Sequence, residues 1–197
     1  MPTTILGLGG SLRPGSTTTL ALRIALEGAA DSGATIHHLD LAEFPLPMFN
    51  GTYSLEAYSP ADQQAIEQLF DAVATAQGII LASPTYHNTI SGAMKNALDM
   101  LEIGTENLPP RMAGKVVGLV TVQGGTSGTG NNTLTTMLLA ARAMQAWVAP
   151  IMVSVPGSRS AFDTDGQILN TAYDTRLRAL GAQVASASEV FAALKVK

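Results

Sequence analysis

The sequence predicts an α/β protein whose parallel sheet is covered by helices on both faces. Short apolar runs and helical apolar stripes alternate five times along the 197 residues, and such alternation builds parallel sheets. The run at 78–82 is apolar throughout, which is typical of a strand buried on both faces. No repeat or linker interrupts this pattern, so we expect a single domain over residues 1–197.

The predicted strands are the short apolar or alternating runs, and they lie at 4–8, 35–41, 78–82, 116–122 and 147–155. Parallel sheets of this kind bind ligands beyond the carboxyl ends of their strands. The loops after the first, third and fourth strands are therefore the informative ones.

The predicted helices carry apolar residues at the i, i+3, i+4, i+7 spacing of one helix face. Gly181 is expected to break the last helix, which resumes toward Leu194. The helices are expected from Thr17 onward, around 66–73, 94–101 and 134–141, and from 169 to 180.

Composition excludes several classes of function. A net charge of −4 with no basic block argues against nucleic acid as a partner. No stretch approaches the roughly 18 apolar residues of a membrane span. The chain has no cysteine, which excludes disulfides and thiolate chemistry and fits a reducing compartment. No signal peptide is evident, so we expect a cytoplasmic location.

The loop between the first strand and the first helix is rich in glycine and hydroxyl residues. It reads Gly9-Gly10-Ser11-Leu12-Arg13-Pro14-Gly15-Ser16-Thr17-Thr18. Free N–H groups at a helix start, with hydroxyls and an arginine, suit a phosphate. The dinucleotide fingerprint fails at Leu12, which replaces its third glycine, and the P-loop fails at Ser16, which replaces its lysine. Two interpretations of this loop remain. It is a binding site for a terminal monophosphate, or it is an ordinary turn capped by Ser16.

Two further loops are expected at the same edge of the sheet. The third strand leads to Tyr86, His87 and Asn88, and an aromatic ring with amide donors suits a flat heteroaromatic ligand. The alternative for His87 is an exposed loop histidine. The fourth strand leads to the glycine-rich segment 123–132, where the backbone can approach a planar ligand closely. A nucleophile elbow is excluded there because Thr129 replaces its closing glycine, and a flexible loop is the other alternative.

Two of these segments resemble signature motifs of the NADPH-dependent FMN reductase family. Gly10-Ser11-Leu12-Arg13 followed by Gly15-Ser16-Thr17-Thr18 is similar to the family's phosphate loop. Residues 83–99 are similar to its Pro-x-Tyr motif followed by Gly-x-Met-Lys-Asn-x-Leu-Asp. Thr18 and His87 depart from the residues that many members carry. The resemblance implies a flavodoxin-like three-layer sandwich with a five-stranded parallel sheet in the order 2-1-3-4-5.

The resemblance also implies an FMN site built from all three loops. The first loop would hold the phosphate, the second would flank the flavin ring and ribityl chain, and the third would lie beside the ring. The residues implied are Ser11, Arg13, Ser16, Thr17, Thr18, Pro84, Thr85, Tyr86, His87, Asn88, Gly124, Gly125, Thr126 and Ser127.

The activity implied by the resemblance is NAD(P)H-dependent reduction of FMN. Reduced flavin would then serve a small-molecule acceptor or leave for a flavin-using monooxygenase. The cofactor carries this chemistry, so no catalytic acid or base and no metal ligand is expected. The family forms dimers or tetramers, so a homodimer or homotetramer is expected. Three alternatives are a quinone, azo-dye or metal-oxyanion reductase on this scaffold, a flavodoxin-like electron carrier without NAD(P)H activity, and a mononucleotide-binding protein that takes no flavin.

Three other features are weaker candidates. Asp40 ends the second strand, where a dinucleotide fold places its ribose-binding acid, but the failed fingerprint disfavours that role. His37 and His38 are adjacent on a strand, so they point to opposite faces and cannot share a metal. The loop 44–49 is too apolar for a solvated loop, so it packs on a subunit partner, covers the cofactor or folds onto its own domain.

Overall fold

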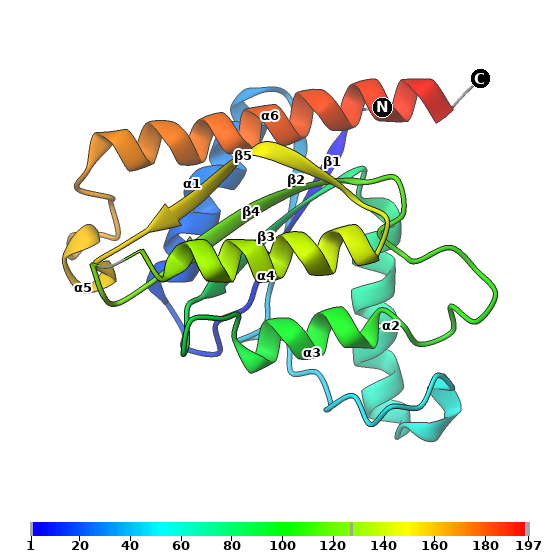
Figure 1. Ribbon diagram of the computed structural model, residues 1–197. Helices are drawn as coiled ribbons and strands as arrows, with labels where there is room; N and C mark the ends of the chain where they lie inside the picture. The colour runs from blue at the N-terminus through cyan, green and yellow to red at the C-terminus, as the bar shows by residue number, and fades with distance from the viewer. Residues whose placement is uncertain (1, 127, 196–197) are drawn as a thin grey trace.

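The computed structural model describes residues 2–126 and 128–195 and contains a five-stranded parallel sheet (Figure 1). The strand order is β2-β1-β3-β4-β5, as the family resemblance implies, and all neighbouring strands pair in parallel, as the alternation of elements predicts. The strands are β1 (Thr4–Gly9), β2 (Thr35–Asp40), β3 (Gly78–Pro84), β4 (Val116–Val122) and β5 (Trp147–Val155).

Helices cover both faces of this sheet, with α1 and α6 on one side and α2, α3 and α4 on the other (Figure 1). Within the described residues, no helix combines the length and apolar character needed to cross a membrane. The helices are α1 (Thr17–Asp31), the 3-10 turn η1 (Leu55–Ala57), α2 (Pro60–Thr75), α3 (Gly92–Met100), α4 (Gly130–Ala143), α5 (Ser158–Ala161) and α6 (Thr171–Lys195).

The core lies in two layers, one on each face of the sheet. On β1, Leu6 and Leu8 pack toward α2, α3 and α4, whereas Ile5 packs toward α1 and α6. This division follows from the alternation of side chains along a strand. Strands β3 and β4 are buried along their whole length, which confirms the interpretation of their continuous apolar runs.

Serine residues fix where three of the helices begin. Ser16, Ser59 and Ser91 each accept a hydrogen bond from the backbone N–H three residues later. This bond satisfies one of the free donors at a helix start. The ends of strands β1 and β3 are therefore followed by abrupt, well-defined helix starts, and both starts lie at the carboxyl edge of the sheet.

The expected break in the last helix is wrong, because α6 runs without interruption through Gly181. A Cβ atom at Gly181 would lie 1.8 Å from the carbonyl oxygen of Ala25 in α1. A Cβ atom at Gly28 of α1 would lie 2.2 Å from the carbonyl oxygen of Arg178 in α6. These two glycines are therefore present because the helices cross in backbone contact, and neither ends a helix.

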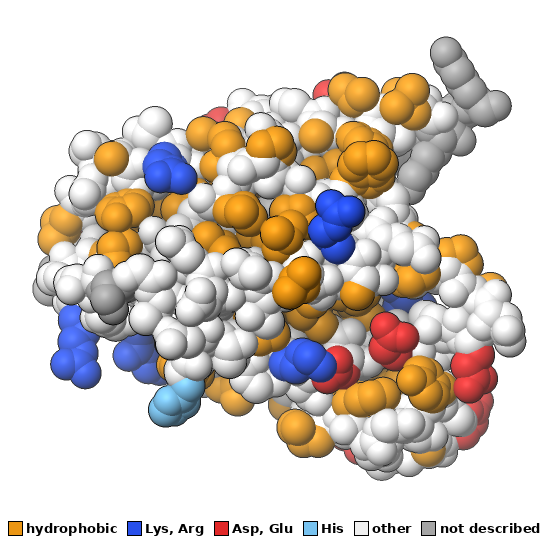
Figure 2. Space-filling view, viewed as in Figure 1, with side chains coloured by type: hydrophobic (Ala, Val, Ile, Leu, Met, Phe, Trp, Pro, Cys, Tyr) orange, Lys and Arg blue, Asp and Glu red, His pale blue; other side chains and the backbone are white. Residues whose placement is uncertain are grey.

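Strand β5 forms one edge of the sheet and lies under an exposed apolar surface. Hydrophobic side chains gather between α4 and α6, over β5 (Figure 2). Trp147 of β5 is 60% exposed and lines a hollow together with Leu138 of α4. The edge itself is blocked, since Pro150 has no N–H and the N–H of Ile151 donates to Oε1 of Gln183 at 2.9 Å.

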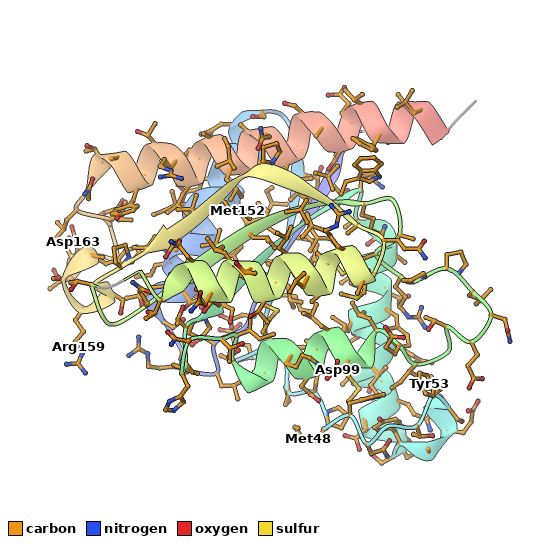
Figure 3. All side chains as sticks on the ribbon, in the orientation of Figure 1. Met48, Tyr53, Asp99, Met152, Arg159 and Asp163 are labelled. Carbon is orange, nitrogen blue, oxygen red and sulfur yellow. The ribbon has the colours of Figure 1, made fainter. Side chains whose placement is uncertain are left out.

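The apolar loop 44–49 folds onto its own domain. The side chain of Asn96 in α3 accepts a hydrogen bond from the N–H of Phe49 and donates one to the carbonyl of Pro47, both at 2.8 Å. Phe44 packs against the core. Met48 is 75% exposed and points away from the body of the protein (Figure 3).

Candidate functional site

A cavity of about 740 Å³ lies at the carboxyl edge of the sheet. Residues of α5 line it, and Figure 1 shows where this short helix lies. Its walls come from the loops after β1, β3 and β4 and from the segment between β5 and α6. The lining residues are Ser11, Arg13, Gly15, Ser16, Thr17, Thr18, Leu20, Pro84, Thr85, Tyr86, Val122, Gly124, Ser158, Arg159, Phe162, Asp163, Thr164, Asp165 and Gly166.

The β1–α1 loop brings its predicted phosphate-binding residues together in this cavity. Ser11, Ser16 and Thr18 are each only 2% exposed, whereas Arg13 is exposed. The N–H of Arg13 donates to Oγ of Ser11 at 3.3 Å. Hydroxyls, a cation and the start of α1 form a donor set that fits a phosphate group.

The β3–α3 loop is held by a chain of hydrogen-bonded threonine hydroxyls. Thr133 on α4 donates to Oγ1 of Thr85 at 2.9 Å, and Thr85 shares a 2.8 Å hydrogen bond with Thr121 on β4. Thr121 also donates to the carbonyl of Ser83 at 3.0 Å. Side chains of α4 and β4 therefore fix the orientation of Thr85 in the cavity wall.

The variant Thr121→Val is expected to lower the free energy of unfolding by about 1–3 kcal/mol. Thr121 is fully buried, so valine would remove the donor to the carbonyl of the buried Ser83 and leave the half-buried hydroxyl of Thr85 with one partner fewer. Thr135→Val is the matched control, because Thr135 is exposed and bonds only to a carbonyl of its own helix. Urea denaturation measures both variants, and equal midpoints would contradict a structural role for the hydroxyl chain.

The second loop makes a tight turn that separates its predicted residues. Tyr86 and Thr89 exchange two backbone hydrogen bonds of 3.0 Å, and between them His87 and Asn88 adopt φ angles of 49° and 66°. Tyr86 lines the cavity and is 55% exposed. His87 and Asn88 are exposed at the tip of the turn and do not line the cavity.

In the third loop, Gly124 lines the cavity, whereas Gly125 and Thr126 do not. The carbonyl of Gly125 accepts a 2.9 Å hydrogen bond from the N–H of Gly157, which ties this loop to the segment after β5. Ser127 lies outside the described residues.

The segment after β5 is a cavity wall that the sequence analysis did not identify. It consists of α5 and a hairpin in which Phe162 pairs with Ile168. A signal was present, because Gly157-Ser158-Arg159-Ser160 repeats the glycine, hydroxyl and arginine content of the first loop. The fifth strand also ends at the same edge of the sheet as the others.

Asp40 has a structural role at the end of β2. Its Oδ2 atom accepts a 3.2 Å hydrogen bond from the hydroxyl of Thr19 in α1, and its Oδ1 atom accepts a 3.0 Å bond from the N–H of Ala42. The carboxylate of Asp40 therefore holds the backbone after β2 and the first turn of α1 in place. Asp40 does not line the cavity.

A parallel sheet of this order, with a phosphate-suited cavity at its carboxyl edge, defines a flavodoxin-like mononucleotide-binding protein. The profile of the NADPH-dependent FMN reductase family matches residues 3–159. The chain therefore belongs to the NADPH-dependent FMN reductase family, a family of oxidoreductases that use FMN and NAD(P)H.

Curated relatives carry several reductase activities. An NADPH azoreductase of Bacillus sp. is 36% identical over 118 residues, a match that spans 60% of each chain. An NAD(P)H-dependent FMN reductase of Pseudomonas aeruginosa is 27% identical over 172 residues and 84% of each chain. A probable NADPH:quinone oxidoreductase of Oryza sativa is 33% identical over 127 residues, 63% of this chain and 58% of the relative.

Solved structures share the fold at lower identity. The flavoenzyme FerB, an NAD(P)H:acceptor oxidoreductase of Paracoccus denitrificans, superimposes with a TM-score of 0.74 at 17% identity, covering 95% of this chain and 97% of FerB. A WrbA-like flavodoxin of Agrobacterium tumefaciens gives a TM-score of 0.64 at 20% identity, covering 96% and 98%. These likenesses confirm the flavodoxin-like fold.

Proposed function

We propose that the protein is an NAD(P)H-dependent FMN reductase that holds FMN in the cavity at the carboxyl edge of the sheet. The observation that carries this proposal is the first loop, where buried Ser11 and Ser16 and the exposed guanidinium of Arg13 line one cavity at the start of α1. Ser11, Arg13, Ser16, Thr17 and Thr18 bind the phosphate in this proposal.

The walls beside the first loop suit the rest of the cofactor. Pro84, Thr85 and Tyr86 offer an apolar and aromatic surface with one fixed hydroxyl, and Gly124 leaves open space, since a Cβ there would meet no atom within 4 Å. His87, Asn88, Gly125, Thr126 and Ser127 remain proposed neighbours of the ring.

When bound in this cavity, FMN would supply the redox chemistry between NAD(P)H and an acceptor. The side chains of the cavity bind the cofactor and orient its ring. The exposed Tyr86 and the open mouth of the cavity leave room for a second ligand beside the ring. We assign no general acid or base to this site.

Mixing the FMN-loaded protein with NADPH under anaerobic conditions is expected to bleach the oxidised-flavin absorbance. Stopped-flow spectroscopy measures the rate, and free FMN at the same concentration is the control. A protein that binds FMN but is not bleached would support the electron carrier instead. A protein that takes up no FMN would support a mononucleotide-binding protein of another kind.

The similarity to the azoreductase over 118 residues supports a second candidate, an azo or quinone reductase on the same site. In that case the acceptor would be an organic molecule that binds at the mouth of the cavity. Steady-state rates with a quinone, an azo dye and free FMN separate the two functions. A flavin-using monooxygenase is the proposed partner only where free FMN is the best acceptor.

We also infer a homodimer or homotetramer of a single domain in the cytoplasm. The exposed apolar surface over β5, which includes Trp147, supports association because monomers rarely expose large apolar patches. The absence of cysteine supports a reducing compartment. Sedimentation velocity tests the assembly, and a single species near the 20.4 kDa chain mass would contradict it.

A further inference from the structure

We propose that Arg159 is a second phosphate-binding residue of the cavity, directed at a phosphomonoester. This proposal rests on the proposed function, since it assigns a further binding residue to the same cavity. Arg159 belongs to α5, in the wall that the sequence analysis did not identify, and it lines the same cavity as Arg13.

The backbone that carries Arg159 is fixed to the glycine-rich third loop. The N–H of Gly157 donates to the carbonyl of Gly125, and the N–H of Ser158 donates to the carbonyl of Gln123, both at 2.9 Å. Gly157 adopts a φ angle of +61°, which glycine tolerates best. The main chain of α5 is therefore anchored at the cavity, while the side chain of Arg159 is exposed.

The other end of this wall is fixed to α1, the helix that follows the phosphate loop. Arg23 of α1 donates to the carbonyl of Gly166 at 3.5 Å. A Cβ atom at Gly166 would lie 3.0 Å from Cδ2 of Leu20, which shows how closely the hairpin approaches α1. These contacts hold two arginines, from distant parts of the sequence, beside one cavity.

Neither arginine is neutralised by the protein. Among residues 2–126 and 128–195, the guanidinium groups of Arg13 and Arg159 form no ion pair and no hydrogen bond. Arg23 and Arg178, by contrast, both pair with Glu27. The guanidinium groups of Arg13 and Arg159 are therefore available to donate hydrogen bonds to the oxygens of a bound anion.

Asp163 and Asp165 line the same wall, and neither carboxylate forms an ion pair with Arg159 within the described part of the chain. Oδ1 of Asp163 accepts hydrogen bonds from the N–H groups of Asp165 and Gln167, at 3.0 and 2.8 Å, so Asp163 shapes the hairpin. In Figure 3 the side chain of Arg159 extends away from Asp163. The guanidinium therefore remains available to a ligand, and its planar set of donors matches phosphate oxygens.

Two ligands of this enzyme class carry a phosphomonoester, namely FMN at its 5′ position and NADPH at its 2′ position. If Arg159 binds the first, its loss weakens FMN binding and leaves riboflavin binding unchanged. If it binds the second, its loss weakens NADPH binding and leaves NADH binding unchanged. Pairs of ligands that differ only in the phosphate therefore show which of the two phosphate groups Arg159 binds.

The experiment compares Arg159→Ala and Arg159→Lys with Arg142→Ala as the matched control. Arg142 is exposed, lies outside the cavity and also forms no ion pair with a described residue, so its variant loses the same charge. Fluorescence titration of the apoprotein gives the dissociation constants of FMN and riboflavin. Calorimetric titration of the FMN-loaded protein, under anaerobic conditions, gives those of NADP⁺ and NAD⁺ as non-reacting forms of the co-substrates.

For Arg159→Ala we expect about a tenfold loss of affinity for one phosphate-bearing ligand and less than about a twofold change for its phosphate-free counterpart. Arg159→Lys should recover part of the loss, and Arg142→Ala should match the wild type. Arg159→Ala affinities equal to those of Arg142→Ala for all four ligands would overturn the proposal. A wild-type protein that binds neither FMN nor NADP⁺ would overturn the proposed function, and with it this role of Arg159.

Discussion

Replacing Arg13 with alanine is expected to weaken FMN binding by roughly 10–100-fold, the effect of losing one charge-assisted hydrogen bond. Arg13 lines the cavity beside the buried hydroxyls of Ser11 and Ser16. Its guanidinium forms no ion pair within the described part of the chain. The substitution therefore removes a ligand contact without breaking a bond that holds the fold. Fluorescence titration of the apoprotein measures the affinity.

Riboflavin is the matched ligand for this variant, because it lacks only the phosphate. Its affinity should be the same for Arg13→Ala and the wild type, and the melting temperature should also be unchanged. Equal loss for FMN and riboflavin would place Arg13 at the ring and not at the phosphate. An unchanged FMN affinity would contradict the assignment of the β1–α1 loop as the phosphate site.

The variant Gly181→Ala is expected to destabilise the protein by about 3 kcal/mol, a fall in melting temperature of roughly 6–12 °C for a chain of this size. Helix propensity alone predicts the opposite sign, since alanine is favoured over glycine inside a helix. The crossing with α1 outweighs that preference, because the new methyl group would lie 1.8 Å from the carbonyl oxygen of Ala25. A backbone atom cannot move aside as a flexible side chain can.

Gly92→Ala is the control for this prediction. Gly92 is the first residue of α3, and a Cβ atom there would meet no atom within 4 Å. Alanine at this position should leave the stability unchanged or raise it slightly. Gly28→Ala should repeat the loss, because its Cβ atom would lie 2.2 Å from the carbonyl oxygen of Arg178. A Gly181→Ala protein as stable as Gly92→Ala would contradict the close crossing of α1 and α6.

Local patterns in the sequence were sufficient to predict the sheet and most of its helices. The runs at 116–122 and 147–155 are strands β4 and β5 with the predicted bounds. The first run is informative because a strand covered on both faces requires continuous apolar residues, whereas β5 is an edge strand that is only partly buried. The serine caps at Ser16 and Ser91 were also predictable, since a cap depends on only four consecutive residues.

The structural role of Gly181 could not be predicted from local sequence patterns. Glycine ends helices and also permits close helix crossings, and the two uses look alike along a sequence. Which one applies depends on Ala25, a residue far away in the chain that packs against it only in the folded protein. The expected break was therefore wrong for a reason that only the packing of α1 on α6 reveals.

The candidate site, too, could be predicted only in part. The sequence by itself determined the fold class and the three loops after β1, β3 and β4, because hydroxyl, glycine and aromatic residues there follow recognisable strands. The folded structure is needed to see that Tyr86 lines the cavity while His87 occupies the turn, and that the segment containing α5 and Arg159 forms a fourth wall. The physical reason is that a loop's composition is local, whereas the direction of its side chains is set by hydrogen bonds to distant segments, such as that between Gly157 and Gly125.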